Sequence, residues 1–97
     1  MVVHIVMFQF KEEGRKQNIN TAKGMLDSLP GFVPTLRSME TGINFSPEER
    51  AMDLSIITIF DDKAGLEAYA VHPEHLKVVE FIKSVAVVSK VVDYEKN

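Results

Sequence analysis

Four stretches of the chain carry the hydrophobic pattern of β-strands. Val2–Phe10 and Met52–Phe60 are rich in β-branched and aromatic residues, and both alternating faces of each are largely apolar. Leu36–Ile43 divides into alternating faces of mixed polarity, and a last stretch of this kind lies at about Val85–Tyr94. We therefore predict four strands, of which the first and the third lack a polar face.

The segments between these strands have the spacing of amphipathic helices. From about Glu13 to Leu29, apolar residues recur three and four positions apart, and the sequence Leu29-Pro30-Gly31 ends this helix. Asp61 and Asp62 offer N-cap oxygens to a short helix that ends near Val71. Pro73 begins a third helix, because its missing N–H would be unpaired at that position in any case.

The resulting order is β-α-β-β-α(α)-β, which predicts an α+β protein of the ferredoxin-like type. Right-handed crossovers place both helical segments on one face of an antiparallel four-stranded sheet. The other face would then expose more apolar surface than a monomer in water tolerates. We predict that a second copy covers it, as a symmetric homodimer packed sheet to sheet.

Size and composition exclude several classes of protein. The 97 residues suit one domain spanning residues 1–97, and 45% hydrophobic with 26% charged residues is typical of a soluble globular protein. A net charge of −3 with scattered basic residues gives no basis for nucleic-acid binding. There is no cysteine for a disulfide or thiolate metal site. The apolar start, MVVHIVMFQF, lacks a basic leader and alternates like a strand, so we expect a cytoplasmic protein without membrane contact.

The sequence YAVHPEH, residues 69–75, contains the candidate catalytic side chains. At about 100° per residue, His75 falls within the arc defined by Leu76, Val78, Val79 and Ile82, so it should face the sheet. Desolvation would keep this imidazole neutral and able to accept a proton. Asp93, if close, would fix its tautomer, and the phenol of Tyr69 would polarise a carbonyl oxygen.

A structural role fits the same residues. A buried histidine bonded to Asp93 would tie the third helix to the last strand, and Tyr69 would span from core to surface. His72 precedes Pro73 at the helix junction; it is a mediocre N-cap residue and would be a solvent-facing spacer or the rim of a pocket. His72 and His75 have no converging third ligand, so we predict no metal. The sequence leaves catalysis and structure open for this cluster.

His4 lies among apolar residues on its strand, so it is predicted to be internal. If its face meets the helices, His4 and His75 line one cavity; if not, His4 lies in the dimer interface. No cofactor is expected, since the chain has no glycine-rich phosphate loop and the Leu-Pro-Gly turn is not one.

Several motifs resemble the stress-responsive A/B barrel domain family. They are HIVMFQF, LPGFVPTLRSMETGINFSPE, FDDKAGLEAYAVHPEHLKVVEFI and VVDYE, and the resemblance covers essentially the whole chain. It implies a ferredoxin-like monomer whose sheet pairs with that of a second copy in a dimeric α/β barrel. Most members of the family have no known activity.

The resemblance extends to a related plant polyketide cyclase, which closes a linear polyketide thioester by aldol condensation. Its working tyrosine and histidine match Tyr69 and His75, the aspartate that supports this histidine matches Asp93, and a pocket histidine matches His4. This chain departs at Leu54, where the cyclase has another histidine, and in the segment 44–52.

Two functions follow from these observations. The first is a small homodimeric protein that binds a hydrophobic ligand between helices and sheet. The alternative is a cofactor-free cyclase-like or monooxygenase-like enzyme acting on a polyketide or aromatic compound, with His75 as base and Tyr69 as acid. The enzyme requires an open cavity with His75 and Tyr69 on its wall, whereas a packed interior favours a protein without catalysis.

Overall fold

The chain folds into four strands and three α-helices, and the computed structural model describes all residues 1–97. Its elements are β1 (Val2–Phe10), α1 (Arg15–Asp27), the 3₁₀ turn η1 (Leu29–Gly31), β2 (Ser38–Ile43), β3 (Leu54–Phe60), α2 (Lys63–Ala70), α3 (Pro73–Val85) and β4 (Ala86–Glu95). This order confirms the prediction, and each boundary lies within about two residues of the expected one.

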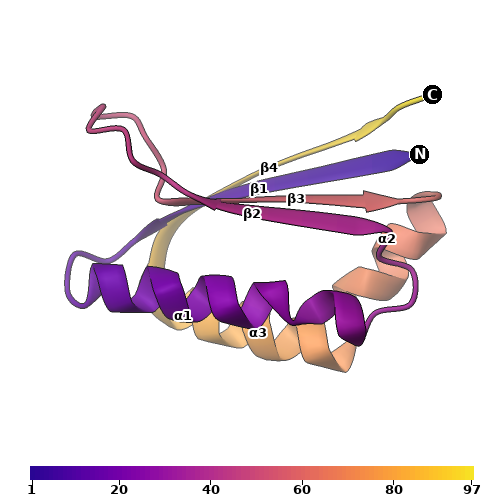
Figure 1. Cartoon of the computed structure of the whole chain (residues 1–97), viewed down its shortest axis with the longest axis horizontal. Coiled ribbons are helices and arrows are strands. Elements are labelled where there is room, and N and C mark those ends of the chain that lie inside the picture. Colours follow the sequence, from indigo (N-terminus) through magenta and orange to yellow (C-terminus); the bar gives the residue numbers. More distant parts are fainter.

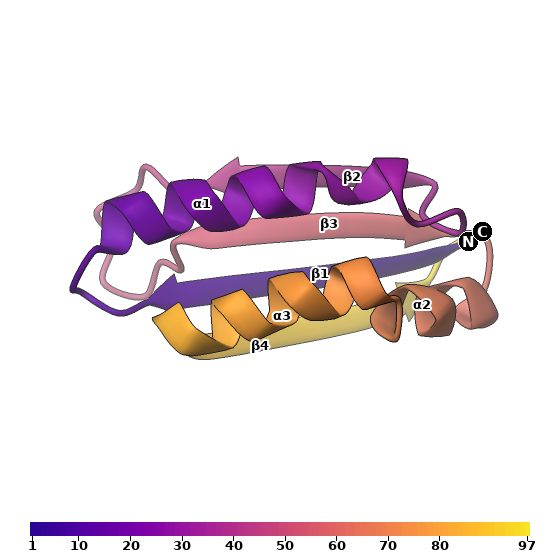
Figure 2. The same cartoon turned by 90° about the horizontal axis from the view of Figure 1, so that it is seen from below.

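One antiparallel sheet contains all four strands, in the order β2-β3-β1-β4. Helices α1 and α3 lie next to each other along one face of this sheet, and α2 lies at its end (Figure 1, Figure 2). The α+β ferredoxin-like arrangement predicted from the sequence is therefore confirmed.

The strand register decides which way His4 points. His4 pairs with Thr58 of β3 on one side and with Asp93 of β4 on the other. Directly paired residues share one face of a sheet, and Thr58 is completely buried on the face that the helices cover. The sequence left the direction of His4 open, and the structure places it, with Val6 and Phe8, on the helix side.

The hydrophobic core fills the space between the sheet and the helices. Phe10 and Phe60, at the ends of β1 and β3, are both 0% exposed. Helix α1 contributes Ile19, Ala22 and Leu26, whose three- and four-residue spacing puts them on one side of the helix. No helix around this core is both long and apolar enough to cross a membrane.

Side-chain caps mark the start of both α2 and α3. The carboxylate of Asp62 accepts a hydrogen bond from the backbone N–H of Gly65 at 2.8 Å, which confirms the predicted N-cap of α2. The Nδ1 atom of His72 accepts one from the backbone N–H of Glu74 at 3.1 Å, directly before Pro73 opens α3. Each of the two helices therefore begins at a side chain that accepts a hydrogen bond from its first turn.

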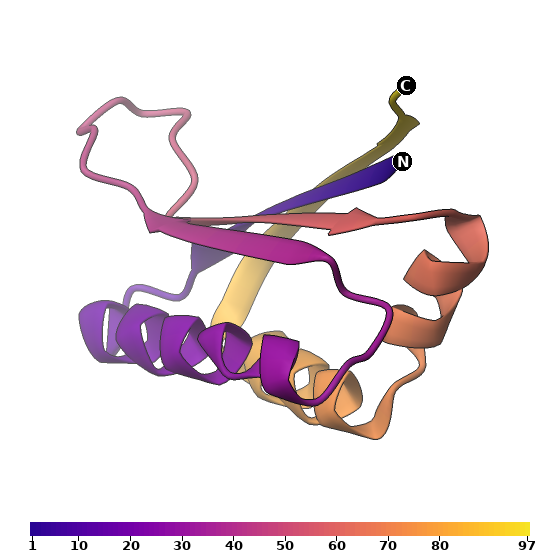
Figure 3. The same cartoon turned by 45° about the vertical axis from the view of Figure 1, so that its right-hand side comes forward.

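The opposite face of the sheet is apolar and has no helix over it (Figure 1). Ile5 pairs with Ile57 and with Val92, and Val3 pairs with Tyr94 on the same face. Val92 and Tyr94 are 51% and 46% exposed. We call this side of the sheet the outer face. The loop of residues 44–53, between β2 and β3, extends on the same side (Figure 3).

Candidate functional site

A cavity of about 440 Å³ lies between α3 and the sheet. This volume is within the range of small-molecule sites, roughly 300–1,000 Å³. Twelve of its sixteen lining residues are hydrophobic, and the other four are His4, His75, Lys83 and Ser89. The interior is therefore open where the candidate residues were expected, instead of being packed solid.

Helix α3 presents one side to this cavity. Its cavity-lining residues are His75, Val78, Val79, Ile82 and Lys83. The spacing of three and four residues confirms the prediction that His75 faces the sheet. Leu76 was predicted to face the sheet together with His75, and this is wrong. Leu76 is 49% exposed, because it lies about 100° from His75, at the margin of the helix surface that packs against the sheet.

The imidazole of His75 is half-buried and has a defined tautomer. Its Nδ1 atom lies 3.1 Å from the backbone oxygen of Ala70. A carbonyl oxygen only accepts hydrogen bonds, so Nδ1 must carry the hydrogen, and Nε2 of the neutral ring keeps a free lone pair. Burial lowers the pKa of His75, although the bond to Ala70 acts against this; nearby His4 and His72 lower it further. The neutral base is thus favoured.

Tyr69, on the last turn of α2, packs against His75 and Phe60. The ring centroids of Tyr69 and His75 are 4.2 Å apart with 40° between the planes, and those of Tyr69 and Phe60 are 5.2 Å apart. Burial raises the pKa of Tyr69 to about 12, so the phenol keeps its hydrogen. The hydroxyl has no hydrogen-bond partner in the protein and is not completely buried, and Tyr69 is one of the residues that line the cavity.

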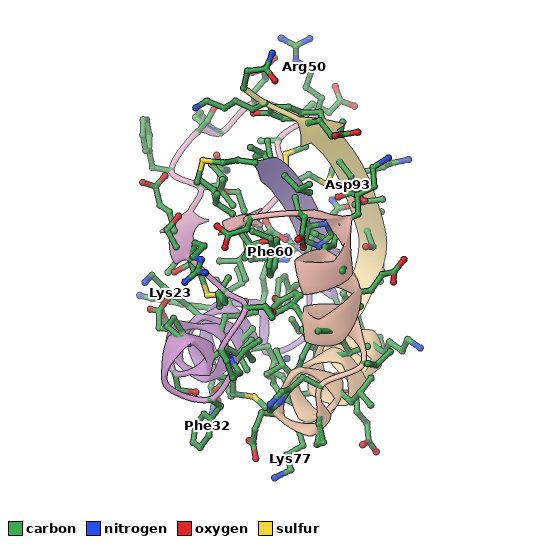
Figure 4. The ribbon with its side chains drawn as sticks, turned by 90° about the vertical axis from the view of Figure 1, so that its right-hand side faces the viewer. Lys23, Phe32, Arg50, Phe60, Lys77 and Asp93 are labelled. Atoms are coloured by element: carbon green, nitrogen blue, oxygen red, sulfur yellow. The ribbon has the colours of Figure 1, made fainter.

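Asp93 supports a different histidine from the one expected. Its Oδ1 atom accepts a hydrogen bond from Nδ1 of His4, directly across the β1–β4 pair. The expected pairing of Asp93 with His75 is wrong, since the Nδ1 atom of that ring is bonded to Ala70. Figure 4 shows Asp93 on β4, the edge strand of the sheet, with Phe60 between the sheet and the helices.

His4 lines the cavity from the sheet side, near Tyr69 and His75. Its ring centroid is 6.3 Å from that of Tyr69, in an edge-on arrangement. The backbone oxygen of His4 accepts a hydrogen bond from the hydroxyl of Thr58 at 3.2 Å, which holds this part of β1 against β3. His4, Tyr69 and His75 therefore converge from three different elements.

His72 lies apart from this convergence. It is not among the cavity-lining residues, and its Nδ1 atom is engaged in capping α3. Nowhere does the structure bring three His, Cys, Asp or Glu side chains into a group that could hold a metal ion. The observed position of His72 is that of a helix cap.

Comparison with known proteins identifies the family. Residues 2–96 match the family model of the stress responsive A/B barrel domain. The chain belongs to this family. The resemblance drawn from the sequence motifs is thereby confirmed over nearly the whole A/B barrel domain, and a comparison with curated proteins found no match.

Solved structures similar to this A/B barrel domain include two bacterial proteins described as dimeric, ferredoxin-like and of unknown function. The Bacteroides fragilis protein is 28% identical, with a TM-score of 0.90 and 98% of this chain and 95% of that chain covered. The Jannaschia sp. protein is 31% identical, with a TM-score of 0.83 and 98% of each chain covered. A hydroxynitrile lyase from Passiflora edulis, 20% identical, shares the fold, with a TM-score of 0.86 and 99% of this chain and 93% of that chain covered.

Sequence reasoning missed two polar residues of the A/B barrel domain's cavity. Lys83 lies eight residues after His75 on the cavity side of α3, and Ser89 pairs with Phe8 on the helix-facing side of β4. The helical spacing from His75 would have found Lys83. A charged residue near a helix end is typical of a solvent-exposed position, and for that reason Lys83 was not predicted to line a cavity.

Proposed function

We propose that this protein binds a small, largely apolar carbonyl compound in the cavity between α3 and the sheet. The observation that supports this is the shared position of the His75 imidazole and the Tyr69 ring on the cavity wall. The remaining wall is mostly aliphatic and would hold an apolar body. At the end where His75 and Tyr69 lie, the Tyr69 phenol offers a hydrogen-bond donor to a carbonyl group.

The chemistry that this end supports best is removal of a proton from the carbon next to the carbonyl. Nε2 of neutral His75 takes the proton, and the Tyr69 hydroxyl donates a hydrogen bond to the carbonyl oxygen as negative charge develops on it. If the ligand contains a second carbonyl group, the enolate carbon attacks it and a C–C bond forms. His75 then returns its proton to the new alkoxide, so the enzyme is regenerated without a cofactor.

We further propose that the working form is a homodimer packed through the outer face. Apolar residues from three strands lie on that face, and Met7, Val92 and Tyr94 are all well exposed in the single chain. The Bacteroides and Jannaschia proteins of the same fold are dimeric. A twofold axis between two such sheets would bury both apolar faces at once.

The function is tested with a panel of β-dicarbonyl compounds that carry alkyl or aromatic groups. Binding is measured by thermal shift, and exchange of the α-protons in deuterium oxide is followed by proton NMR. The wild type should be stabilised by at least one compound and should accelerate its exchange, whereas His75→Ala should lose the acceleration. Lys77→Ala is the matched control, because Lys77 is an exposed residue of the same helix that lies outside the cavity.

Three outcomes distinguish ligand binding from proton transfer and test His75 as the base. Binding without accelerated exchange would retain the ligand-binding function and reject the proton transfer. Exchange that persists in His75→Ala would reject the role of this base. The absence of any bound compound would reject the function as a whole.

A further inference from the structure

The cavity has a second polar end that the proposed chemistry does not use. Lys83 of α3 and Ser89 of β4 both line it, and both side chains are exposed to solvent. The wall between the two ends is formed by aliphatic side chains such as Val79 and Ile82. The cavity is therefore polar at each end and apolar in its middle.

Two backbone spacings give the approximate separation of the ends. His75 and Lys83 are eight residues apart on α3, or about 12 Å at a rise of about 1.5 Å per residue. On the sheet, β1 advances four residues from His4 to Phe8, the partner of Ser89, which is about 13 Å. Figure 2 shows that α3 and β1 run in the same direction, so the two lengths describe the same axis of the cavity.

Neither residue at this second end is engaged by the protein itself. Lys83 takes part in no ion pair, whereas Lys77 on the same helix lies 3.1 Å from the carboxylate of Glu74. The hydroxyl of Ser84 donates to a backbone carbonyl at 2.6 Å, whereas the hydroxyl of Ser89 forms no hydrogen bond. An ammonium group and a hydroxyl are thus both available to an anionic group.

We propose that Lys83 is a specificity-determining residue that binds the carboxylate of an elongated ligand. The inference rests on the proposed function, since the carbonyl group of the same ligand would lie at Tyr69 and His75. An extended chain advances about 3.5 Å for every three bonds, so a gap of about 12 Å corresponds to roughly ten bonds. The substrate class is a keto acid with its carbonyl and carboxylate groups separated by that length of apolar chain.

A lysine in the last turn of a helix also interacts favourably with the helix dipole. That role would need no ligand and would be independent of the charge on any bound molecule. It predicts an effect of Lys83 on stability alone. Binding of an acid compared with its neutral ester distinguishes the two roles.

The experiment uses a saturated methyl-ketone acid with roughly ten bonds between its carbonyl and carboxylate groups, together with its methyl ester. Their dissociation constants are measured by calorimetry for the wild type, Lys83→Met, Lys83→Arg and the control Lys77→Met. The wild type should bind the acid more tightly than the ester. Lys83→Met should weaken the acid about tenfold and leave the ester within about twofold, because only a charge-assisted hydrogen bond is lost. Lys83→Arg should retain the preference for the acid, and Lys77→Met should behave like the wild type.

Each contrary result has a separate meaning. If the wild type binds the ester as tightly as the acid, or if Lys83→Met weakens both equally, the role of Lys83 is overturned while apolar binding stands. If the wild type binds neither the two probes nor any compound of the dicarbonyl panel, the proposed function fails, and this inference fails with it.

Discussion

The ring of His75 lies against the ring of Tyr69, with centroids 4.2 Å apart. The two residues are six positions apart in sequence and belong to different helices, so their contact depends on the junction between α2 and α3. His72 caps α3 at that junction, and Ala70 accepts the hydrogen bond of His75. The candidate acid and base are therefore positioned mainly by local interactions within a few residues of the chain.

The pH dependence of stability should report the buried His75. Its pKa in the folded state lies below the ordinary value of 6.5, so the unfolded state binds its proton more readily. The contribution of His75 is therefore complete above pH 6.5 and declines as the pH falls below that value through the folded-state pKa. Urea unfolding of the wild type and His75→Gln between pH 8 and about pH 5 should show a smaller acid loss in the variant. Equal losses would contradict a pKa lowered by folding.

The Tyr69 hydroxyl should matter to the reaction and little to stability. Tyr69→Phe keeps the buried ring and removes a hydroxyl that has no partner in the protein, so the free energy of unfolding should change by less than about 1 kcal/mol. Accelerated α-proton exchange should fall by about 100-fold, the usual effect of losing one donor to a developing oxyanion. Undiminished exchange in Tyr69→Phe would remove the phenol from the mechanism.

Truncation of Tyr69 to alanine tests the packing of its ring separately from the role of its hydroxyl. Tyr69→Ala removes a ring that is only 2% exposed and leaves a void beside Phe60 and His75. We expect a loss of about 3–5 kcal/mol in the free energy of unfolding, measured by urea denaturation. A loss near that of Tyr69→Phe would mean that the ring is not part of the core.

The pair of His4 and Asp93 should act on ring orientation more than on stability. The Asp93 side chain is 47% exposed, so Asp93→Ala should cost less than about 1 kcal/mol. Without its acceptor, Nδ1 of His4 no longer has a fixed partner, and nitrogen NMR of the imidazole should show a changed tautomer distribution. An unchanged His4 spectrum in Asp93→Ala would contradict the hydrogen bond between the two strands.

The outer face should control assembly. Val92→Glu places a charge at a position that is already half exposed in the single chain, so the fold should persist while the dimer dissociates. Analytical ultracentrifugation at micromolar concentration should find a monomer. Val71→Glu is the matched control, because Val71 is 70% exposed at the helix junction and away from the sheet. A dimeric Val92→Glu, or a monomeric wild type, would reject the proposed interface.

Most of the fold could be predicted because local patterns determine it. The alternation of Val2–Phe10, the Leu29-Pro30-Gly31 stop and the caps at Asp62 and Pro73 all lie within a few residues of the boundaries that they set. The direction of His4 could not be predicted, since both faces of its strand are apolar and only the packed helices distinguish them.

The role of Asp93 in the candidate site was harder to predict, because it depends on a contact between distant segments. The choice of Asp93 between His4 and His75 is made by the register of β1 with β4, which brings residues 89 positions apart into contact. The register of two strands cannot be derived from the spacing of residues along the chain. Leu76 was misplaced for a related reason: helical periodicity gives the direction of a side chain but not the width of the surface that covers it.

Strand β1 turns His4 toward the cavity and its neighbours Val3 and Ile5 toward the outer face. One strand therefore supplies side chains both to the cavity and to the proposed dimer interface. A shift of this strand by a single position would exchange the two sets, moving the imidazole of His4 out of the cavity and onto the proposed interface. Redesign of either surface is consequently constrained by the other.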